Sequence, residues 1–365
     1  ITTFRREGGY ADARHPDTVT FDAGLEEDLS RRDFTINAMA LDRDGTVIDP
    51  FGGQRDLERG LIRCVGDPVE RFSEDALRMM RAVRFSAQLG YRIEEETSNA
   101  IRVLAPDLKK ISAERIQTEL VKLLTSPHPD YLRMAYETGI TKVVLPEFDL
   151  CMITEQKNPH HCYTVGEHTL VAMQAVRADK VLRLAMLFHD MGKPLCVTTD
   201  EEGIDHFHGH PSVSEEIAGN VLHRLKFDND TIYMVKKLVK YHDQYIEPQP
   251  KNVRCAIRKM GEDVFPLLLE VKEADVQAQS DFLREKKEKN LKDVRDVYQR
   301  ILEEKQCVSL KTLAINGKDL IDQTGMKPGK ELGEVLNELL DLVTEDPARN
   351  TREYLLKAAK ERLKR

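Results

Sequence analysis

A carboxylate and a guanidinium stand three residues apart in the stretch 70–85, which runs ERFSEDALRMMRAVRF. Asp75 can only accept hydrogen bonds, whereas Arg78 can only donate them, in a planar fork. Held side by side, the two groups would match cytosine and adenine, which carry an amino donor beside a ring acceptor. A carbonyl of uracil or guanine would instead leave buried acceptors unpaired, at a cost of about 1–3 kcal/mol. Arg81 and Arg84 follow at the same interval and could hold a triphosphate.

A single helix would position these four groups. Ser73 predicts the N-cap, acidic residues occupy the first turn, and no Gly or Pro interrupts the run before Gly90. Asp75 and the arginines would then follow one slowly drifting stripe. The alternative is a solvated ion-pair face, because such pairs are common on helices and weak.

A second set of residues between 158 and 281 suits a metal. His168 lies in a helical pattern, and the dipeptide His189-Asp190 ends another, where Gly192 and Pro194 close it. His210, His242 and Asp275 follow. Imidazole nitrogen and carboxylate oxygen suit a divalent transition metal or magnesium, which could activate water against a phosphoester. The alternative is a set of packed histidines with a structural role.

The rest of the pattern predicts strands first and helices afterwards. Residues 1–6 and 18–21 are typical of strands, and Asp44-Gly45 between apolar runs predicts a hairpin. From Ser73 onward nearly everything predicts helix. The helical ranges are 93–104, 112–125 and 129–140, then a charged helix over 285–305 and an apolar-faced one over 332–343.

Composition describes a soluble globular chain of two or three domains. The 365 residues are 41% hydrophobic and 32% charged, and no run of about 18 apolar residues predicts a membrane span. The six cysteines form no C-x-x-C pair, which favours reduced thiols in the cytoplasm. The net charge of -8 gives no global nucleic-acid signature, so RNA would need local basic surface, for which 284–292 and 357–365 are candidates.

Three stretches together carry a resemblance. Residues 31–40 (RRDFTINAMA), 49–57 (DPFGGQRDL) and 70–85 closely resemble, in order and spacing, the bacterial class II tRNA nucleotidyltransferase (CCA-adding) and poly(A) polymerase family. The resemblance implies base selection by Asp75 and Arg78 without a nucleic-acid template, and magnesium for nucleotidyl transfer. The nucleotide-binding positions it implies are Arg32, Asp75, Arg78, Arg81 and Arg84, with Asp33 and Asn37 as further motif positions beside the triphosphate.

The His and Asp set resembles the HD superfamily of metal-dependent phosphohydrolases. This implies a divalent metal (Mg, Mn, Ni or Fe) on His168, His189, Asp190 and Asp275, with His189 and Asp190 as the catalytic pair. His210 and His242 match histidines that bind a second metal or the phosphate in some members. The match to HD-x-G-K-P is shared with HD-containing tRNA nucleotidyltransferases. His160, His161, Cys162, His206 and His208 are expected to be structural or exposed.

The family's carboxylates for nucleotidyl transfer come from a G-G-x-x-R-D loop and a D-x-D strand upstream of where Ile1 aligns. Two partial matches in this chain are excluded. Residues 52–56 are one residue too short and belong to the DPFGG motif, and Asp42 and Asp44 fit a hairpin tip better than a metal site. Either these residues were removed from the start, or they exist in the protein but lie outside the given sequence. We expect the chain as given to bind nucleotide weakly and hydrolyse phosphoesters but not to polymerise.

The predicted organisation is mainly α: the C-terminal part of a small α/β nucleotidyltransferase head followed by an all-helical neck, HD domain and tail. The predicted boundaries are 1–66 for the head, 67–150 for the neck that binds base and RNA, 151–282 for the HD domain and 283–365 for the tRNA-binding tail. The predicted function is addition of CTP and ATP to the 3′ end of tRNA, with an accessory HD phosphohydrolase, in the cytoplasm and without a membrane partner. The alternatives are a poly(A) polymerase and a stand-alone HD phosphohydrolase regulated by nucleotide.

Overall fold

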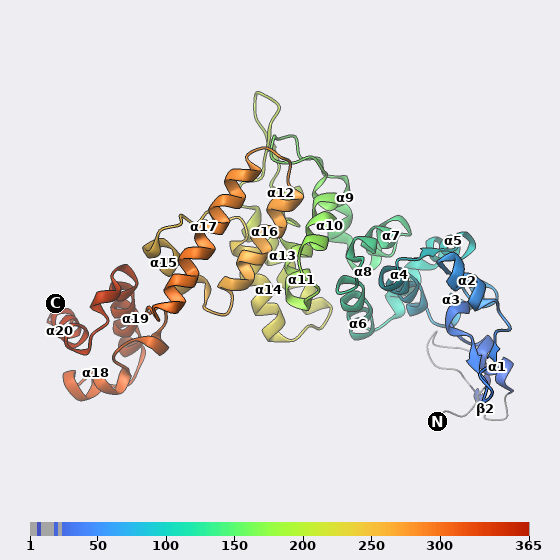
Figure 1. Cartoon of the computed structure of the whole chain (residues 1–365), viewed down its shortest axis with the longest axis horizontal. Coiled ribbons are helices and arrows are strands. Elements are labelled where there is room, and N and C mark those ends of the chain that lie inside the picture. Colours follow the sequence, from blue (N-terminus) through green and yellow to red (C-terminus); the bar gives the residue numbers. More distant parts are fainter. Residues whose placement is uncertain (1–5, 9–17, 21–23, 365) are drawn as a thin grey trace. The chain divides into compact units, whose positions relative to one another are not determined.

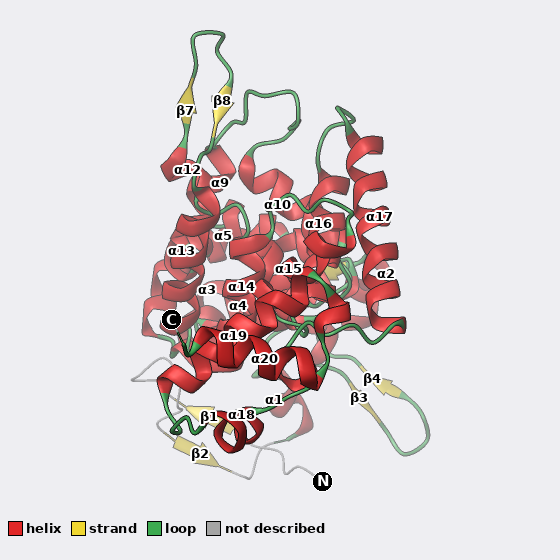
Figure 2. Ribbon diagram, turned by 90° about the vertical axis from the view of Figure 1, so that its left-hand side faces the viewer, coloured by secondary structure: helices red, strands yellow, loops and turns green. Residues whose placement is uncertain are grey.

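The computed structural model describes residues 6–8, 18–20 and 24–364. Within these ranges the chain is mostly helical, and its short strands occur in two-stranded pairs (Figures 1 and 2). The expectation of a mainly α protein is confirmed. None of the helices in the described ranges is both long and apolar enough to cross a membrane.

The first of two compact units comprises residues 1–239 and 278–280. Its first helical elements, in chain order, are α1 Leu25–Ser30, η1 Thr35–Asn37, α2 Gly53–Arg59, α3 Pro68–Glu74, α4 Leu77–Leu89, α5 Glu95–Leu104, η2 Ala105–Lys110, α6 Ala113–Leu124, η3 Pro129–Tyr131, α7 Leu132–Glu137 and α8 Thr141–Val144. It continues through α9 Pro146–Ile153, α10 Val165–Ala175, α11 Lys180–Phe188, α12 Lys193–Cys196, α13 His210–Arg224 and α14 Asn229–Tyr241. Helix α4 packs on α6, α3 on α5, and α10 on both α9 and α11. These contacts place the motif-bearing segments against a helical scaffold.

The strand pairs are β1 Arg6–Gly8 with β2 Thr18–Thr20, β3 Ala40–Leu41 with β4 Val47–Ile48, β5 Leu61–Ile62 with β6 Arg92–Ile93, and β7 Thr198–Thr199 with β8 Asp205–His206. The β3–β4 pair confirms the predicted hairpin: Gly45 has φ +87° in its turn, and Asp44 Oδ1 accepts from Thr46 N at 3.0 Å. The remaining residues of the predicted strands 1–6 and 18–21 lie outside the described residues. Strand β6 and the β7–β8 hairpin (Figure 2) correct the expectation of helix throughout the later chain.

The helix predicted from Ser73 begins earlier and is interrupted. Asp67 Oδ1 accepts from Val69 N at 2.7 Å and Glu70 N at 3.1 Å, so α3 starts at Pro68, and Ser73 lies within it. Asp75 has extended backbone angles (φ −148°, ψ 102°) and separates α3 from α4. An Asp N-cap followed by Pro is a stronger start signal than Ser73. The predicted end was right, because Gly90 closes α4 with φ +71°.

The second unit comprises residues 240–277 and 281–365. Its helices are α15 Pro250–Met260, α16 Phe265–Ala278, α17 Arg284–Glu303, η4 Leu310–Thr312, α18 Gly317–Thr324, α19 Lys330–Glu345, η5 Pro347–Arg349 and α20 Arg352–Arg362. Helix α15 packs on α17 and α19, and α18, α19 and α20 pack on one another around Leu320, Leu339, Val343 and Leu355. The predicted helix with an apolar face over 332–343 is confirmed. The finer division of the chain into four domains remains a prediction.

Candidate functional site

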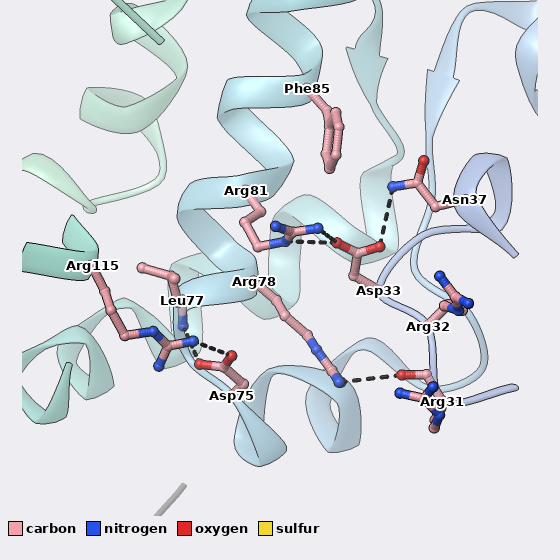
Figure 3. Close-up of a pocket in the computed structure, with 10 residues that line it drawn as sticks. All are labelled: Arg31, Arg32, Asp33, Asn37, Asp75, Leu77, Arg78, Arg81, Phe85 and Arg115. Carbon is pink, nitrogen blue, oxygen red and sulfur yellow. Dashed lines mark hydrogen bonds and ion pairs between the residues drawn. The ribbon is translucent and has the colours of Figure 1, made fainter. Parts of the chain in front are cut away.

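A cavity of about 520 Å³ opens between residues 31–37, the start of α4 and helix α6 (Figure 3). Five arginines, two aspartates, an amide and two apolar side chains line it: Arg31, Arg32, Asp33, Asn37, Asp75, Leu77, Arg78, Arg81, Phe85 and Arg115. Six of the seven predicted nucleotide-binding residues are therefore brought together. Only Arg84 is not among the lining residues.

The DPFGG motif holds the loop that carries Arg32 and Asp33. Asp49 accepts from Gly53 N at 2.7 Å and Gln54 N at 2.9 Å, which fixes the start of α2. A Cβ at Gly53 would lie 2.3 Å from the carbonyl oxygen of Thr35, so only glycine permits this approach. Thr35 Oγ1 also donates to the buried Asp56 at 2.8 Å. The two motifs thus form one rigid support for the pocket wall.

Asp33 supports other pocket residues through both of its oxygens. Its Oδ1 accepts from Phe34 N at 3.0 Å and Asn37 Nδ2 at 3.2 Å, and its Oδ2 accepts from Arg81 Nε at 2.7 Å (Figure 3). The carboxylate therefore ties α4 to the 31–37 loop and orients the Arg81 guanidinium toward the cavity.

Asp75 and Arg78 share the cavity but do not pair with each other. Asp75 Oδ1 accepts from Leu77 N at 3.1 Å, and Oδ2 accepts from Arg115 Nη2 at 2.7 Å (Figure 3). Arg78 Nη1 instead donates to Glu74 at 2.5 Å, and Nη2 donates to the Arg31 carbonyl at 3.2 Å. Because Asp75 precedes α4, the single helical stripe predicted for Asp75 and the arginines was wrong. Each group keeps its own partner from another segment.

The two arginines of the loop share one acidic partner. Asp28 of α1 lies 2.5 Å from Arg31 Nη2 and 3.2 Å from Arg32 Nη2. Asp28 is 6% exposed, whereas the Arg32 side chain is 44% exposed and faces the cavity. A half-exposed guanidinium with a buried counter-ion is suited to hold phosphate, because it can gain a charge-assisted bond without losing its support.

Arg84 lies one turn beyond Arg81 and points into the protein. Its side chain is 9% exposed and its Nε lies 2.8 Å from Glu119 of α6. The guanidinium also lies 3.8 Å from the centre of the Phe85 ring. Phe85 lines the cavity, so Arg84 contacts the pocket wall from behind.

A buried cluster forms around Asp190 in the first unit. His168 of α10 and His189, just after α11, place their Nε2 atoms 3.2 Å apart, and these lie 3.6 and 3.3 Å from Asp190 Oδ2. His210, the first residue of α13, places Nε2 3.3 Å from Asp190 Oδ1. The close approach of α12 to α13 is possible because Gly192 has no Cβ, which would lie 2.7 Å from Ser214 N.

Backbone carbonyls set the tautomers of these histidines. The Nδ1 atoms lie 3.2 Å from Ala278 O for His168, 2.6 Å from Met186 O for His189 and 2.8 Å from Phe207 O for His210. A carbonyl only accepts, so each Nδ1 carries a proton, and Nε2 is the ring nitrogen that faces the cluster. His168, His189 and Asp190 each offer one ligand atom within 4.8 Å of the others. This donor set fits a divalent cation.

The charge of Asp190 is preserved despite burial. Burial alone would raise the pKa of Asp190, but His189 and Lys193 outweigh it and hold the pKa well below its usual value. Lys193 Nζ lies 2.7 Å from Asp190 Oδ2, 2.8 Å from Gln156 Oε1 and 3.4 Å from His161 Nε2. An ionised carboxylate is the form that a metal ligand needs.

The last two predicted ligands belong to the second unit. His242 follows α14 and is 3% exposed, and Asp275 lies on α16 and is half-buried. Lys272, one turn before Asp275, donates to the carbonyl oxygens of His242 at 2.6 Å and Gln244 at 3.0 Å. The turn that carries His242 is thereby fixed to α16.

Comparison with known proteins decides the family. Family models match over three ranges: the poly A polymerase head domain over 1–63, the probable RNA and SrmB-binding site of polymerase A over 90–152, and tRNA nucleotidyltransferase domain 2 over 196–359. The CCA-adding enzyme of Ligilactobacillus salivarius is 35% identical over 364 residues, which cover 100% of this chain and 78% of that relative. The chain belongs to the CCA-adding enzyme family. The resemblance carried by residues 31–40, 49–57 and 70–85 is confirmed.

One further relative and one solved structure match this chain over a similar length. The CCA-adding enzyme of Limosilactobacillus reuteri (strain DSM 20016) is 34% identical over 367 residues, covering 99% of this chain and 78% of that protein. The crystal structure of the Bacillus stearothermophilus CCA-adding enzyme in complex with CTP superimposes with a TM-score of 0.69 at 28% identity, covering 100% of this chain and 78% of that one. The nucleotidyltransferase head and helical arrangement are thus shared along the chain.

Membership of the CCA-adding family implies a divalent metal for transfer. Asp33 and Asp75 do not fit that metal, because each forms an ion pair with an arginine. Within the described residues, neither belongs to a group of side chains that could hold a metal ion. In the part of the chain that the structure describes, both carboxylates of the pocket thus form ion pairs with arginines.

Sequence patterns missed several residues that complete the two sites. Arg115 stands 40 residues from Asp75 on another helix, where no local signal marks it. Glu74 and Arg31 lie inside the quoted motifs and were overlooked, although a carboxylate four residues before Arg78 is a helix-pairing signal. His161, which was expected to be structural or exposed, lies beside Lys193, a contact that is compatible with a structural role.

Proposed function

We propose that this chain selects the nucleotides in a CCA-adding enzyme, which as an intact protein adds CMP and AMP units, from CTP and ATP, to the 3′ end of tRNA without a nucleic-acid template. The observation that carries the proposal is the cavity in which Asp75 and Arg78 face the same space beside Arg32 and Arg81. Similarity to a CCA-adding enzyme over 100% of this chain and 78% of that relative supports it. Magnesium is the metal that we propose for the transfer step.

The residues take distinct roles in this proposal. Asp75 accepts from the exocyclic amino group of cytosine or adenine, and Arg78 donates to the adjacent ring acceptor. Arg32 and Arg81 bind the triphosphate, with Arg81 oriented by Asp33. Asn37 lies beside the phosphates, and Arg84 acts from behind Phe85. The basic helices α17 and α20 offer surface for the tRNA backbone, and free cysteines accord with a cytoplasmic protein.

Nucleotide incorporation tests this function. Transcripts of tRNA that end before CCA, after C and after CC are incubated with CTP and ATP, separately and together, with magnesium. The expected result is addition that stops after CCA. Long adenylate tails would favour a poly(A) polymerase, and no incorporation or nucleotide binding would contradict both. Intact mass establishes the starting residue of the protein used.

A second function is favoured by the cluster around Asp190. We propose a divalent metal, Mg, Mn, Ni or Fe, on His168, His189 and Asp190, with Asp275 as a further ligand and His210 and His242 for a second metal or the phosphate. The bound metal would supply a polarised water for hydrolysis of phosphoesters. His189 and Asp190 are the catalytic pair, and Lys193 maintains the ionised form of Asp190.

Metal content and hydrolysis test the second function. Protein grown with each metal is analysed by elemental mass spectrometry, and release of phosphate from nucleotides and opening of 2′,3′-cyclic nucleotides are measured. Metal-free protein without hydrolysis would contradict it. Asp75→Asn separates the alternatives: hydrolysis that depends on Asp75 would favour a phosphohydrolase regulated by nucleotide.

A further inference from the structure

Two cavities adjoin on one face of α15 in the second unit. One, of about 540 Å³, lies between α15 and α19, and the other, of about 240 Å³, lies between α15 and the turn 244–246. Cys255 and Lys259 line both cavities, which therefore form one groove across the helix. None of the residues that line this groove belongs to the nucleotide pocket or to the metal-capable cluster around Asp190.

The walls of the groove are fixed by contacts behind them. The buried Arg254 donates to the carbonyl oxygens of Thr344 at 2.8 Å and Glu345 at 3.1 Å, which joins α15 to the end of α19. At the other end, Asn290 of α17 donates to Ile246 O at 3.1 Å. A cavity with walls held in this way is formed before a ligand binds, so little ordering is needed on binding.

An exposed aromatic residue stands at one end of the groove. Tyr245 is 71% exposed, and the amides of Gln244 and Asn252 line the same cavity. Gln244 Oε1 accepts from Lys259 Nζ at 3.2 Å. Asn252 Nδ2 donates to Glu247 at 2.8 Å. Within the described residues, the Gln244 amide nitrogen is left to donate and the Asn252 oxygen to accept. An exposed ring beside a donor and an acceptor suits an unstacked nucleobase, which has a flat face and a polar edge.

Two basic residues line the groove next to this end. Lys259 Nζ lies 5.2 Å from the centre of the Tyr241 ring and forms no ion pair in the part of the chain that the structure describes. Arg258 Nε lies 2.7 Å from Asp341, and its Nη2 donates to Asn337 O at 3.0 Å. Among the described residues, these contacts leave Nη1 of Arg258 and further donors of Lys259 for a ligand. Charged donors of this kind suit a phosphate.

We propose that the groove is a second nucleotide-binding site, which stacks one unpaired base on Tyr245 and binds its phosphate through Lys259 and Arg258. The carboxylates of Asp341 and Glu345 do not exclude an anion, because each has a basic neighbour. An unpaired nucleotide of an RNA strand and a free nucleotide share this chemistry. The site lies outside the nucleotide pocket of the first unit and does not depend on the function proposed there.

Thiol protection tests the site, because Cys255 lies where the two cavities meet. The full chain is alkylated with N-ethylmaleimide alone and with tRNA ending in CC, a single-stranded oligoadenylate or AMP, and each cysteine is followed by peptide mass spectrometry. Cys162, exposed in the first unit, is the internal reference. At about ten times the dissociation constant, about nine-tenths of the sites are filled, so alkylation of Cys255 should slow about tenfold. Alkylation of Cys162 should not change.

The ligands distinguish the two sources of the nucleotide. Protection by tRNA and oligoadenylate but not by AMP assigns the site to RNA, whereas protection by AMP assigns it to a free nucleotide. Asp75→Asn should retain the protection, so a failure of the nucleotide pocket is told apart from a failure of this site. Alkylation of Cys255 that no ligand slows, or equal slowing at Cys162, overturns the inference.

Two pairs of variants test the ring and the cation. Tyr245→Ala should weaken the protecting ligand about tenfold, the effect of one stacked base, while Tyr245→Phe retains the ring and should bind as wild type does. Tyr233→Ala, at a tyrosine of α14 that is 52% exposed, is the matched control. Lys259→Met should weaken binding about fivefold and reduce its salt dependence, unlike Lys330→Met on the exposed surface of α19.

Melting temperatures check that all of these variants fold. An unchanged affinity in Tyr245→Ala, or a loss in Tyr233→Ala of the same size, overturns the inference.

Discussion

The nucleotide pocket and the cluster around Asp190 hold ionised groups in opposite ways. In the pocket each carboxylate faces an arginine, and the pairs stay partly open: the side chains of Asp75 and Arg115 are 18% and 26% exposed. In the cluster, His168 and His189 are fully buried and Asp190 is 2% exposed. In a partly exposed ion pair, one side chain can give up its partner and bind a substrate instead. Buried nitrogen and oxygen atoms that converge on one point are suited to a permanently bound metal ion.

The largest effect is expected at Asp75. Asp75→Asn places an amide donor where the carboxylate accepted, so kcat/KM for CTP should fall about 100-fold while UTP gains relative to CTP. The measurement is single-nucleotide incorporation with each of the four triphosphates. Asp107→Asn, a pair with Lys110 on the surface, is the control and should behave as wild type. An unchanged nucleotide preference would remove Asp75 from base selection.

The next test asks whether the two regions are independent. His189→Ala should reduce bound metal from about one ion per chain to near zero, because it removes one of three converging ligands. Nucleotide incorporation should stay within about twofold, since His189 lies beside His168 and Asp190, which are not among the residues that line the cavity. His208→Ala, an exposed histidine, is the control for metal content. A joint loss of metal and incorporation would break the comparison.

A smaller effect is expected from the partner of Asp75. Arg115→Met leaves a partly buried carboxylate without its 2.7 Å ion pair, so kcat/KM for CTP should fall about tenfold, or roughly 1.4 kcal/mol. Lys122→Met on the same helix, where the side chain is 48% exposed, should change little. Steady-state kinetics with CTP and ATP decide the result. A loss as large as that of Asp75→Asn would mean that Arg115 itself touches the nucleotide.

The smallest effect belongs to an exposed carboxylate outside both regions. Hydrogen bonds from the backbone and side chain of Thr231 lower the pKa of Asp228 from 3.8 to about 2. Because the folded pKa lies below the unfolded one, the stabilisation is present above about pH 4 and is lost as pH falls toward 2. Asp228→Ala should lower stability by about 1 kcal/mol at pH 7, as for a helix cap.

Melting temperatures of wild type and Asp228→Ala at pH 7, 4 and 2 measure this difference. It should shrink as the pH falls below about 4 and be mostly, but not fully, lost at pH 2. A difference that is constant with pH would assign the effect to packing. The stability difference at pH 7 gives a reference value for comparison with the contributions of the buried charged groups in the two sites.

Local patterns predicted much of this protein. The hairpin around Gly45 and the end of α4 at Gly90 depend on backbone conformations and caps set by neighbouring residues. Helix α11 ends at Phe188, just before the predicted His189-Asp190, and Pro194, expected to close it, lies in α12. The grouping of Arg32, Asp33 and Asn37 with Asp75, Arg78 and Arg81 followed from the resemblance of short motifs. The break between α3 and α4 was missed, because the capping signal of Asp67 was given less weight than Ser73.

Residue types and their spacing along the chain therefore decide which groups are available and which helices carry them. Packing between helices decides which charged side chains form pairs. Asp75 pairs with Arg115 of α6, Arg84 is turned toward Glu119, and His168 meets His189 because α10 packs on α11. A helix face fixes the direction of a side chain, but its partner is supplied by another element, whose position only the folded core determines.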